Sequence, residues 1–222
     1  MCNLYNVTTT REAVRALTGA MDRSGWNEPS RDVYPGMLAP IVRAGQDGVR
    51  EMIMATWGMP TPPAYIRGRY DPGVTNIRNV KSPHWRRWLA PANRCVVPFT
   101  RFAEPDPARR EGDRNAWFAA RENGRLLFFA GIWTPWRGVR RVRDGEQDYE
   151  LFGILTCEPN ALVAAVHPKA MPVILHNRSE IELWLSASWP EACQLQRPLA
   201  DDLLVRLPPP AAGSTNEQMR LL

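Results

Sequence analysis

Prolines are spread through the whole of this chain, 21 of them in 222 residues. Proline has no backbone N–H and clashes with the preceding turn of a helix, so a chain with prolines at this spacing does not form long helices. The sequence therefore favours many short strands joined by ordered loops. No internal repeat or long low-complexity linker is visible, and the length suits one large domain with a sizeable core.

Local patterns place the expected elements. Runs of β-branched and aromatic residues between turn formers predict strands over residues 50–57, 94–98, 126–133, 150–156 and 202–207. A capping-box pattern at Thr9-Thr10-Arg11-Glu12, followed by apolar residues at helical spacing, predicts a helix over residues 10–21. Further short helices are expected over residues 158–166 and from a cap at Ser179-Glu180. Because strands and helices are mixed without a regular alternation, the sequence predicts an α+β fold.

Two polar segments are expected to lie outside the core. Residues 137–148 contain an Asp-Gly turn signal and few apolar side chains, which predicts a long exposed loop between two strands. Residues 209–222 begin within a run of three prolines at 208–210 and are expected to form a flexible tail, so the folded domain is placed at residues 1–208.

The sequence carries no sign of secretion or of a membrane span. The N-terminus lacks a basic start followed by an apolar stretch, and no apolar run approaches the roughly 20 residues that a membrane helix needs. The four cysteines are scattered and form no Cys-x-x-Cys pair, and Cys95 and Cys157 lie in apolar stretches typical of buried residues. A reduced cytoplasmic protein, expected to be a monomer, fits these features.

The basic residues are almost all arginines, and they lie among many tryptophans. Lysines and arginines number 28 against 23 acidic residues, and only Lys81 and Lys169 are lysines. Arginine binds phosphate through a planar fork, and the nine tryptophans could stack on bases, so the composition is compatible with binding to single-stranded nucleic acid. A tryptophan-rich core in an arginine-preferring genome would give the same composition.

Known catalytic motifs are absent from the sequence, which directs attention to Cys2. No phosphate-binding glycine loop, zinc-protease motif or nucleophile elbow occurs, and three widely spaced histidines make a metal site or other cofactor unexpected. Removal of Met1 would leave Cys2 with a free α-amine, whose ordinary pKa of about 7.7 to 8.0 leaves part of it neutral at pH 7. Such a residue can attack an aldehyde through nitrogen and close a five-membered thiazolidine through sulfur. The alternative is that Cys2 merely follows the initiator in a frayed terminus.

Six short motifs follow one another along the chain. They are Met-Cys-Asn-Leu-Tyr at residues 1–5, a proline-containing segment at 34–43, Trp57-Gly58, Thr-Asn-Ile-Arg-Asn at 75–79, Arg-Cys-Val-Val-Pro at 94–98 with Phe-Ala-Glu at 102–104, and His-Pro-Lys-Ala-Met-Pro-Val-Ile-Leu at 167–175. In this order, over about residues 1–185, they resemble the SOS-response-associated peptidase family of abasic-site processing proteins. The sequence departs from the family pattern at Leu4, where the family often has arginine, and at Pro105, where it has tryptophan.

The resemblance implies a fold, a reaction and a set of site residues. It implies a single domain with a central, mostly antiparallel, barrel-like sheet flanked by short helices. It implies that Cys2 forms a thiazolidine cross-link with the ring-opened deoxyribose of an abasic site in single-stranded DNA. Asn76 would orient the terminal amine or the aldehyde. Glu104 would act as general acid and base, and His167 would assist proton transfer on the sugar. These proton transfers take place near neutral pH, where a carboxyl of raised pKa or a histidine can perform them.

The resemblance also implies contacts with DNA, at Arg78, Lys169 and Trp57. Phosphate contacts fix the position of a strand without reading its sequence, which is what a lesion-specific protein needs. Such a protein would associate with the nucleoid after DNA damage, and it could release Met1 by self-processing. Taken singly, Asn76 could instead be a turn residue and Glu104 a surface acid. The alternatives for the whole chain are a cysteine peptidase that acts on other proteins, with Cys2 and His167 as a dyad, and a non-catalytic binder of single-stranded DNA.

Overall fold

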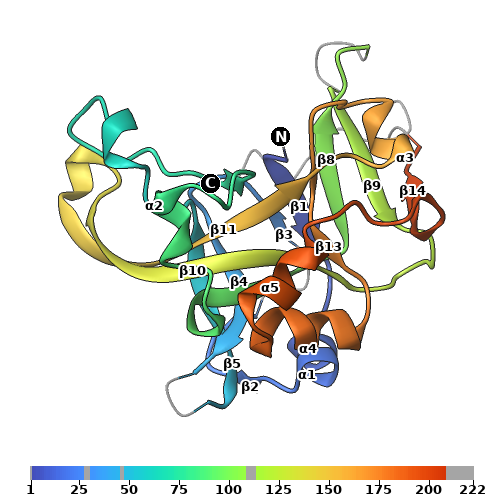
Figure 1. The fold of residues 1–222 in the computed structure, drawn as a ribbon, viewed down its shortest axis with the longest axis horizontal. Helices are drawn as coiled ribbons and strands as arrows, with labels where there is room; N and C mark the ends of the chain where they lie inside the picture. The colour runs from blue at the N-terminus through green and yellow to red at the C-terminus, as the bar shows by residue number, and fades with distance from the viewer. Residues whose placement is uncertain (1, 28–30, 46–47, 109–113, 209–222) are drawn as a thin grey trace.

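The computed structural model describes residues 2–27, 31–45, 48–108 and 114–208 (Figure 1). The tail expected over residues 209–222 lies outside the described residues. Within the described chain no helix is long and apolar enough to cross a membrane.

Five strands form a closed barrel at the centre of the molecule. They are β4 (Leu38–Ala44), β5 (Arg50–Trp57), β7 (Arg94–Phe99), β10 (Leu127–Val139) and β11 (Glu146–Cys157). Neighbouring strands pair antiparallel in the order β11, β10, β7, β4, β5. The ring closes where β11 returns to β5 in parallel, with Leu151 opposite Thr56 and Phe152 opposite Trp57. The expected α+β fold with a mostly antiparallel, barrel-like sheet is confirmed.

A second, antiparallel sheet of five strands stands beside the barrel. In spatial order it contains β14 (Leu204–Arg206), β9 (Asn115–Ala120), β8 (Arg101–Pro105), β1 (Leu4–Val7) and β3 (Arg31–Val33). Four two-residue strands extend the barrel sheet: β2 (Met21–Asp22), β6 (Asn76–Ile77), β12 (Met171–Pro172) and β13 (Ile174–Leu175). The N-terminal strand is therefore an interior strand of a sheet, with β3 on one side and β8 on the other.

The helices are short, as the prolines indicate. They are α1 (Arg11–Thr18), α2 (Pro83–Arg86), α3 (Ala161–Ala164), α4 (Arg178–Ser186) and α5 (Trp189–Ala192). The helix expected over residues 10–21 starts one residue later than predicted, because Thr10 and not Thr9 is its cap and accepts from Ala13 N. It ends at Thr18, before Gly19 in the left-handed conformation. The cap of α4 is Asn177, not the expected Ser179, because the Asn177 side chain accepts from Glu180 N.

The segment expected to be a loop over residues 137–148 is instead a long hairpin arm. Strands β10 and β11 stay paired beyond the barrel, with Arg137 opposite Asp148 and Val139 opposite Glu146. Arg137 donates to both of these carboxylates across the ladder, so polar side chains line a two-sided exposed ribbon. Residues 140–145 form the turn between the two strands, so the expected loop is limited to these residues. The polar side chains at the ends of β10 and β11 reflect exposure on both faces and not the absence of a strand.

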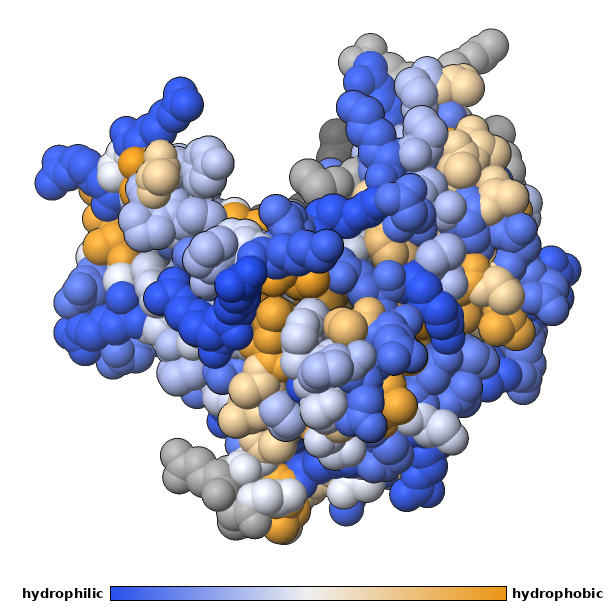
Figure 2. Space-filling model, in the orientation of Figure 1, coloured by the Kyte–Doolittle hydropathy of each residue, from blue (hydrophilic) through white to orange (hydrophobic). Residues whose placement is uncertain are grey.

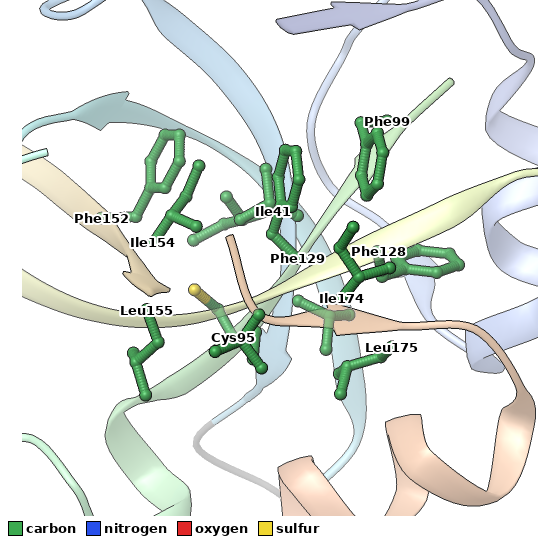
Figure 3. Packing of buried hydrophobic residues seen from close by; sticks show 14 of the residues in the cluster. Ile41, Cys95, Phe99, Phe128, Phe129, Phe152, Ile154, Leu155, Ile174 and Leu175 are labelled. Atoms are coloured by element: carbon green, nitrogen blue, oxygen red, sulfur yellow. The ribbon is translucent and has the colours of Figure 1, made fainter. Parts of the chain in front are cut away.

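Buried aliphatic and aromatic side chains of the barrel strands pack together in the core (Figure 3). Phe99 and Phe129 stack with ring centroids 3.7 Å apart, and Phe102 of β8 lies edge-on to Phe129 at 6.1 Å. Cys95 and Cys157 are buried, as expected. These contacts join β8 to the barrel, so any side chain on the buried face of β8 is held in a fixed position relative to the barrel.

Candidate active site

Cys2 is buried at the start of β1, so the interpretation of a frayed terminus is wrong. The residue is fully inaccessible to solvent, and its Sγ donates to the carbonyl of Leu4 at 3.6 Å. Leu4 then pairs with Ala103 of β8, which places the residues around Ala103 alongside the beginning of the chain. Leu4 itself is buried in the core, so an apolar residue fits this position.

Asn76 holds Cys2 from the barrel side. Strand β6 pairs with β11, with Asn76 opposite Ile154, and the Asn76 side chain reaches across to the N-terminal segment. Its Nδ2 donates to the Cys2 carbonyl at 2.7 Å and to Thr75 Oγ1 at 2.9 Å. Its Oδ1 is buried and has no hydrogen-bond partner among the described residues. Asn76 is therefore not a solvent-exposed turn residue, and its amide is oriented with an acceptor still available.

Trp57 is buried in the core and is linked to Asn76 through Thr75. The indole is 1% exposed, packs edge-on to Tyr5 at 5.2 Å, and stacks with Phe152 at 6.3 Å. Its Nε1 donates to the carbonyl of Thr75 at 3.0 Å. The expectation of a DNA contact is corrected, because a ring buried in this way offers no face to a base. Thr75, which no motif singled out as functional, is the link between Trp57 and Asn76.

Glu104 is a buried acid on β8, not a surface carboxylate. Its side chain is 0% exposed, and it follows Ala103, the partner of Leu4. Burial raises the pKa of Glu104 to about 7, because the charged form loses its hydration. A carboxyl with this pKa can give and take a proton at neutral pH.

His167 completes the cluster from the loop after α3. Its Nδ1 lies 2.7 Å from the carbonyl of Ala170 and 3.5 Å from Glu104 Oε2. A carbonyl can only accept, so Nδ1 carries the hydrogen and Nε2 is the basic nitrogen of the neutral ring. Burial lowers the pKa of His167, while the bond to Ala170 opposes that shift. The imidazole is therefore mostly neutral at pH 7.

The electrostatics of the cluster keep the Cys2 thiol protonated. Burial raises the pKa of this thiol, and the nearby carboxylate of Glu104 raises it further. Nucleophilic cysteines of peptidases have the opposite property, a pKa lowered by a neighbouring cation. The thiol of the resting site is thus a poor nucleophile on its own.

Arg78 and Lys169 lie next to each other at the edge of the cluster. Arg78 Nη1 lies 3.4 Å from the carbonyl of Lys169, and both side chains are exposed. Arg78 also forms an exposed ion pair with Glu158. The other two histidines lie elsewhere, with His84 on the carbonyl of Pro60 and His176 on the carboxylate of Glu180, as expected for structural groups.

The surface is hollowed between the hairpin arm and the β8–β9 side, and β1 begins near the floor of this hollow (Figures 1 and 2). Blue, hydrophilic residues line both of its flanks in Figure 2. In the described ranges no three histidine, cysteine or acidic side chains lie close enough together to hold a metal ion.

Fold and site together define an α+β barrel protein whose second residue, a cysteine, is held among an asparagine, a buried glutamate and a histidine. The chain belongs to the SOS response associated peptidase (SRAP) family, whose model matches residues 1–208. No curated protein matches the sequence.

Three solved structures share the fold. Crystal structures of a protein from Bordetella bronchiseptica and of one from Bacteroides thetaiotaomicron are 22% and 21% identical to the chain, with TM-scores of 0.70 and 0.69. Each comparison covers 92% of this chain, with 98% of the first protein and 90% of the second. A phage-related protein from Bordetella bronchiseptica is 17% identical, covers 93% of both chains and has a TM-score of 0.67. At these identities the likeness concerns the fold alone.

Proposed function

We propose that this protein, after removal of Met1, forms a covalent thiazolidine between Cys2 and the ring-opened sugar of an abasic site in single-stranded DNA. One arrangement supports the proposal above all: Asn76 Nδ2 holds the Cys2 carbonyl at 2.7 Å, beside the buried Glu104 with its pKa of about 7. Such a cross-link would protect the lesion from strand cleavage during the response to DNA damage.

The first half of the reaction forms a Schiff base. The free α-amine of Cys2 attacks the C1′ aldehyde of the opened sugar and gives a carbinolamine. Loss of the hydroxyl as water needs a proton donor near neutrality, and Glu104, about half protonated at pH 7, can supply that proton. The product is a C1′=N double bond, and the aldehyde oxygen leaves in the water.

The second half closes the ring. Cys2 Sγ adds to C1′, the π electrons move to nitrogen, and the thiol proton passes through the Glu104 carboxylate to that nitrogen. The sum is one amine, one thiol and one aldehyde converted to one thiazolidine and one water, without an oxidant. Because the Cys2 thiol is protonated at rest, the amine reacts first and the thiol follows.

His167 and Asn76 suit the remaining tasks. The neutral ring of His167 presents Nε2 as a base that can take the proton of the sugar hydroxyl when the hemiacetal opens. The buried Oδ1 of Asn76 can accept a hydrogen bond from the α-amine that appears when Met1 is removed. The amine would then point its lone pair at the aldehyde.

Arg78 and Lys169 can bind the phosphates that flank the lesion. Arg78 would exchange its exposed partner Glu158 for phosphate, and exposed ion pairs contribute only about 0–1 kcal/mol, so the exchange is not costly. Two neighbouring cations beside the cluster would place the sugar over Cys2 without reading the bases.

A denaturing gel with abasic single-stranded DNA tests the proposal. The wild-type protein should give a shifted band that survives denaturation, and intact-mass measurement should show that the reacting chain lacks Met1. Cys2→Ala should abolish the band, as should insertion of a large residue between Met1 and Cys2, which prevents removal of Met1. Cys95→Ala is the matched control, because Cys95 is buried in the barrel away from the cluster and its replacement should leave the band unchanged.

Each alternative predicts a different result. A cysteine peptidase would cleave a protein substrate without DNA, and a simple binder would show salt-sensitive retention of DNA but no band after denaturation. A band that persists in Cys2→Ala would overturn the proposal. The raised pKa of the Cys2 thiol, and the contact of His167 with Glu104, favour the amine-led reaction over a Cys–His dyad.

A further inference from the structure

A large cavity of the described chain lies outside the cluster around Cys2. It has a volume of about 720 Å³ and opens between the segment of residues 80–94 and the helix α5 with its following turn. Figure 1 shows α2 and α5 on the same face of the molecule. Cavities of about 300–1,000 Å³ are the size that binds small organic groups.

The walls of this cavity are apolar and its charged groups are all positive. Leu89, Pro91 and Trp189 form apolar surface, while Lys81 and Arg86 are exposed cations at the opening. No acidic residue is among the described residues that line it. The acid of the adjacent helix, Glu191, is turned back to cap that helix at Ser188, so it does not neutralise the opening.

A third cation lies within the wall of the cavity. Arg94 is 0% exposed, and its Nε and Nη1 donate to the carbonyls of Leu89 and Trp184 at 2.8 and 2.7 Å. Its Nη2 has no hydrogen-bond partner, and no carboxylate pairs with it among the residues that the structure describes. A buried guanidinium without a counter-charge makes the cavity attractive to an anion.

The cavity lies next to the segment that carries Arg78. Gln196, which lines the cavity, donates from Nε2 to the carbonyls of Arg78 and Thr156, both at 2.9 Å. Val80, another lining residue, is only two positions beyond Arg78. A strand whose phosphate contacts Arg78 would therefore reach this opening with its next nucleotides.

We propose that this cavity binds a nucleotide of the same single strand, with the base against the apolar wall at Trp189 and the phosphate between Lys81 and Arg86. The inference rests on the proposed function for the direction of the strand. Aromatic walls with flanking cations are how proteins hold single-stranded DNA without regard to sequence. Such a site would give the protein affinity for the strand before it meets a lesion.

Cys193 provides a reporter at the wall of the cavity. It is partly exposed, whereas Cys95 and Cys157 are buried, so in a Cys2→Ala background iodoacetamide should modify Cys193 first. That background cannot cross-link, so lesion-free oligo-dT measures binding alone. We expect saturating oligo-dT to slow the alkylation of Cys193 at least about tenfold, as followed by mass spectrometry.

Charge variants locate the phosphate. Affinity for oligo-dT is measured at several salt concentrations, and the logarithm of the binding constant is plotted against the logarithm of the salt concentration. In the double variant Lys81→Ala/Arg86→Ala, the steepness of this line should fall by about 0.7 for each phosphate that the protein no longer neutralises. Arg87→Ala is the matched control, since Arg87 follows Arg86 directly but stacks on Trp88 and does not line the cavity. Trp189→Ala should weaken binding about 5- to 150-fold. Because Trp189 also packs on Trp184, the charge variants decide the question if that protein does not fold.

The outcomes separate this inference from the proposed function. Equal effects of the double variant and Arg87→Ala, or unchanged alkylation of Cys193 with DNA, would overturn it. Protection of Cys193 by an acidic, apolar peptide but not by oligo-dT would also overturn it in favour of a protein partner. If Cys193 is protected but wild-type protein forms no cross-link, the cavity stands and the reaction proposed for Cys2 fails.

Discussion

Replacing Glu104 by Gln should change how the stability of the protein depends on pH. The side chain is fully buried, and burial raises its pKa from an ordinary 4.5 to about 7. Between these two values the folded protein holds a proton that the unfolded chain has released, so stability falls as pH rises. Glutamine has nearly the same shape and does not titrate, so the variant should lack this contribution.

The size of the effect follows from the shift. A difference of 2.5 between about 7 and 4.5, at 1.36 kcal/mol per pH unit, gives about 3 kcal/mol of stability lost by wild type between pH 4 and pH 8. The loss begins near pH 4.5, is steepest up to pH 7, and is complete above it. The free energy of unfolding of Glu104→Gln, relative to wild type, should rise by this amount over the same range.

Urea denaturation at pH 4, 5, 6, 7 and 8 measures the difference directly, because other titrating groups contribute equally to both proteins. Glu12→Gln is an informative control, since hydrogen bonds at the start of α1 lower the pKa of Glu12. Relative to wild type, that variant should lose stability as pH rises. Parallel pH curves for wild type and Glu104→Gln would refute the raised pKa, and with it the proton-transfer role proposed for Glu104.

Three further substitutions test the support of the site. Asn76→Ala removes the donor to the Cys2 carbonyl and should slow single-turnover cross-linking about 5- to 150-fold; an unchanged rate would contradict its role. Trp57→Phe keeps a ring but cannot donate to the Thr75 carbonyl, and the same assay should show about a fivefold decrease in rate. Gly73→Ala should lower the urea midpoint by more than Gly124→Ala. The backbone angle φ is near +80° at both glycines, so both alanines are strained, but only at Gly73 would the new Cβ lie 2.4 Å from a guanidinium nitrogen of Arg140.

The sequence predicted strands best where one face is buried. Residues 50–57 form a strand with the expected bounds, since apolar residues there face the barrel interior. Residues 137–148 were expected to be a loop because their side chains are polar. Only residues 140–145 form a connecting turn, whereas residues 137–139 and 146–148 pair as strands through cross-strand partners such as Arg137 and Asp148. A local pattern holds no information about such a distant partner.

The site was predicted through ordered motifs more than through local chemistry. Asn76, Glu104 and His167 look like ordinary polar residues in sequence. Only the pairing of β1 with β8 and of β6 with β11 brings Glu104 and Asn76 to Cys2, and the loop after α3 places His167 against Glu104. The sequence wrongly predicts a DNA contact for Trp57, because a tryptophan in a motif can equally well stack on a base or pack in the core. Its hydrogen bond to Thr75 depends on the fold and left no signal in the sequence.

The parallel closure of the barrel lies next to the hydrogen bonds that hold Asn76 and Cys2. Only two residue pairs join β5 to β11, at Leu151 and Phe152, and this short seam lies beside Trp57 at the end of β5. Asn76 lies on β6, which pairs with β11. A slip of one strand along the other would pull the indole away from Thr75 and turn the amide off the Cys2 carbonyl. In the reaction proposed above, such a movement would therefore slow the capture of an aldehyde by Cys2, although only two residue pairs of the barrel had changed.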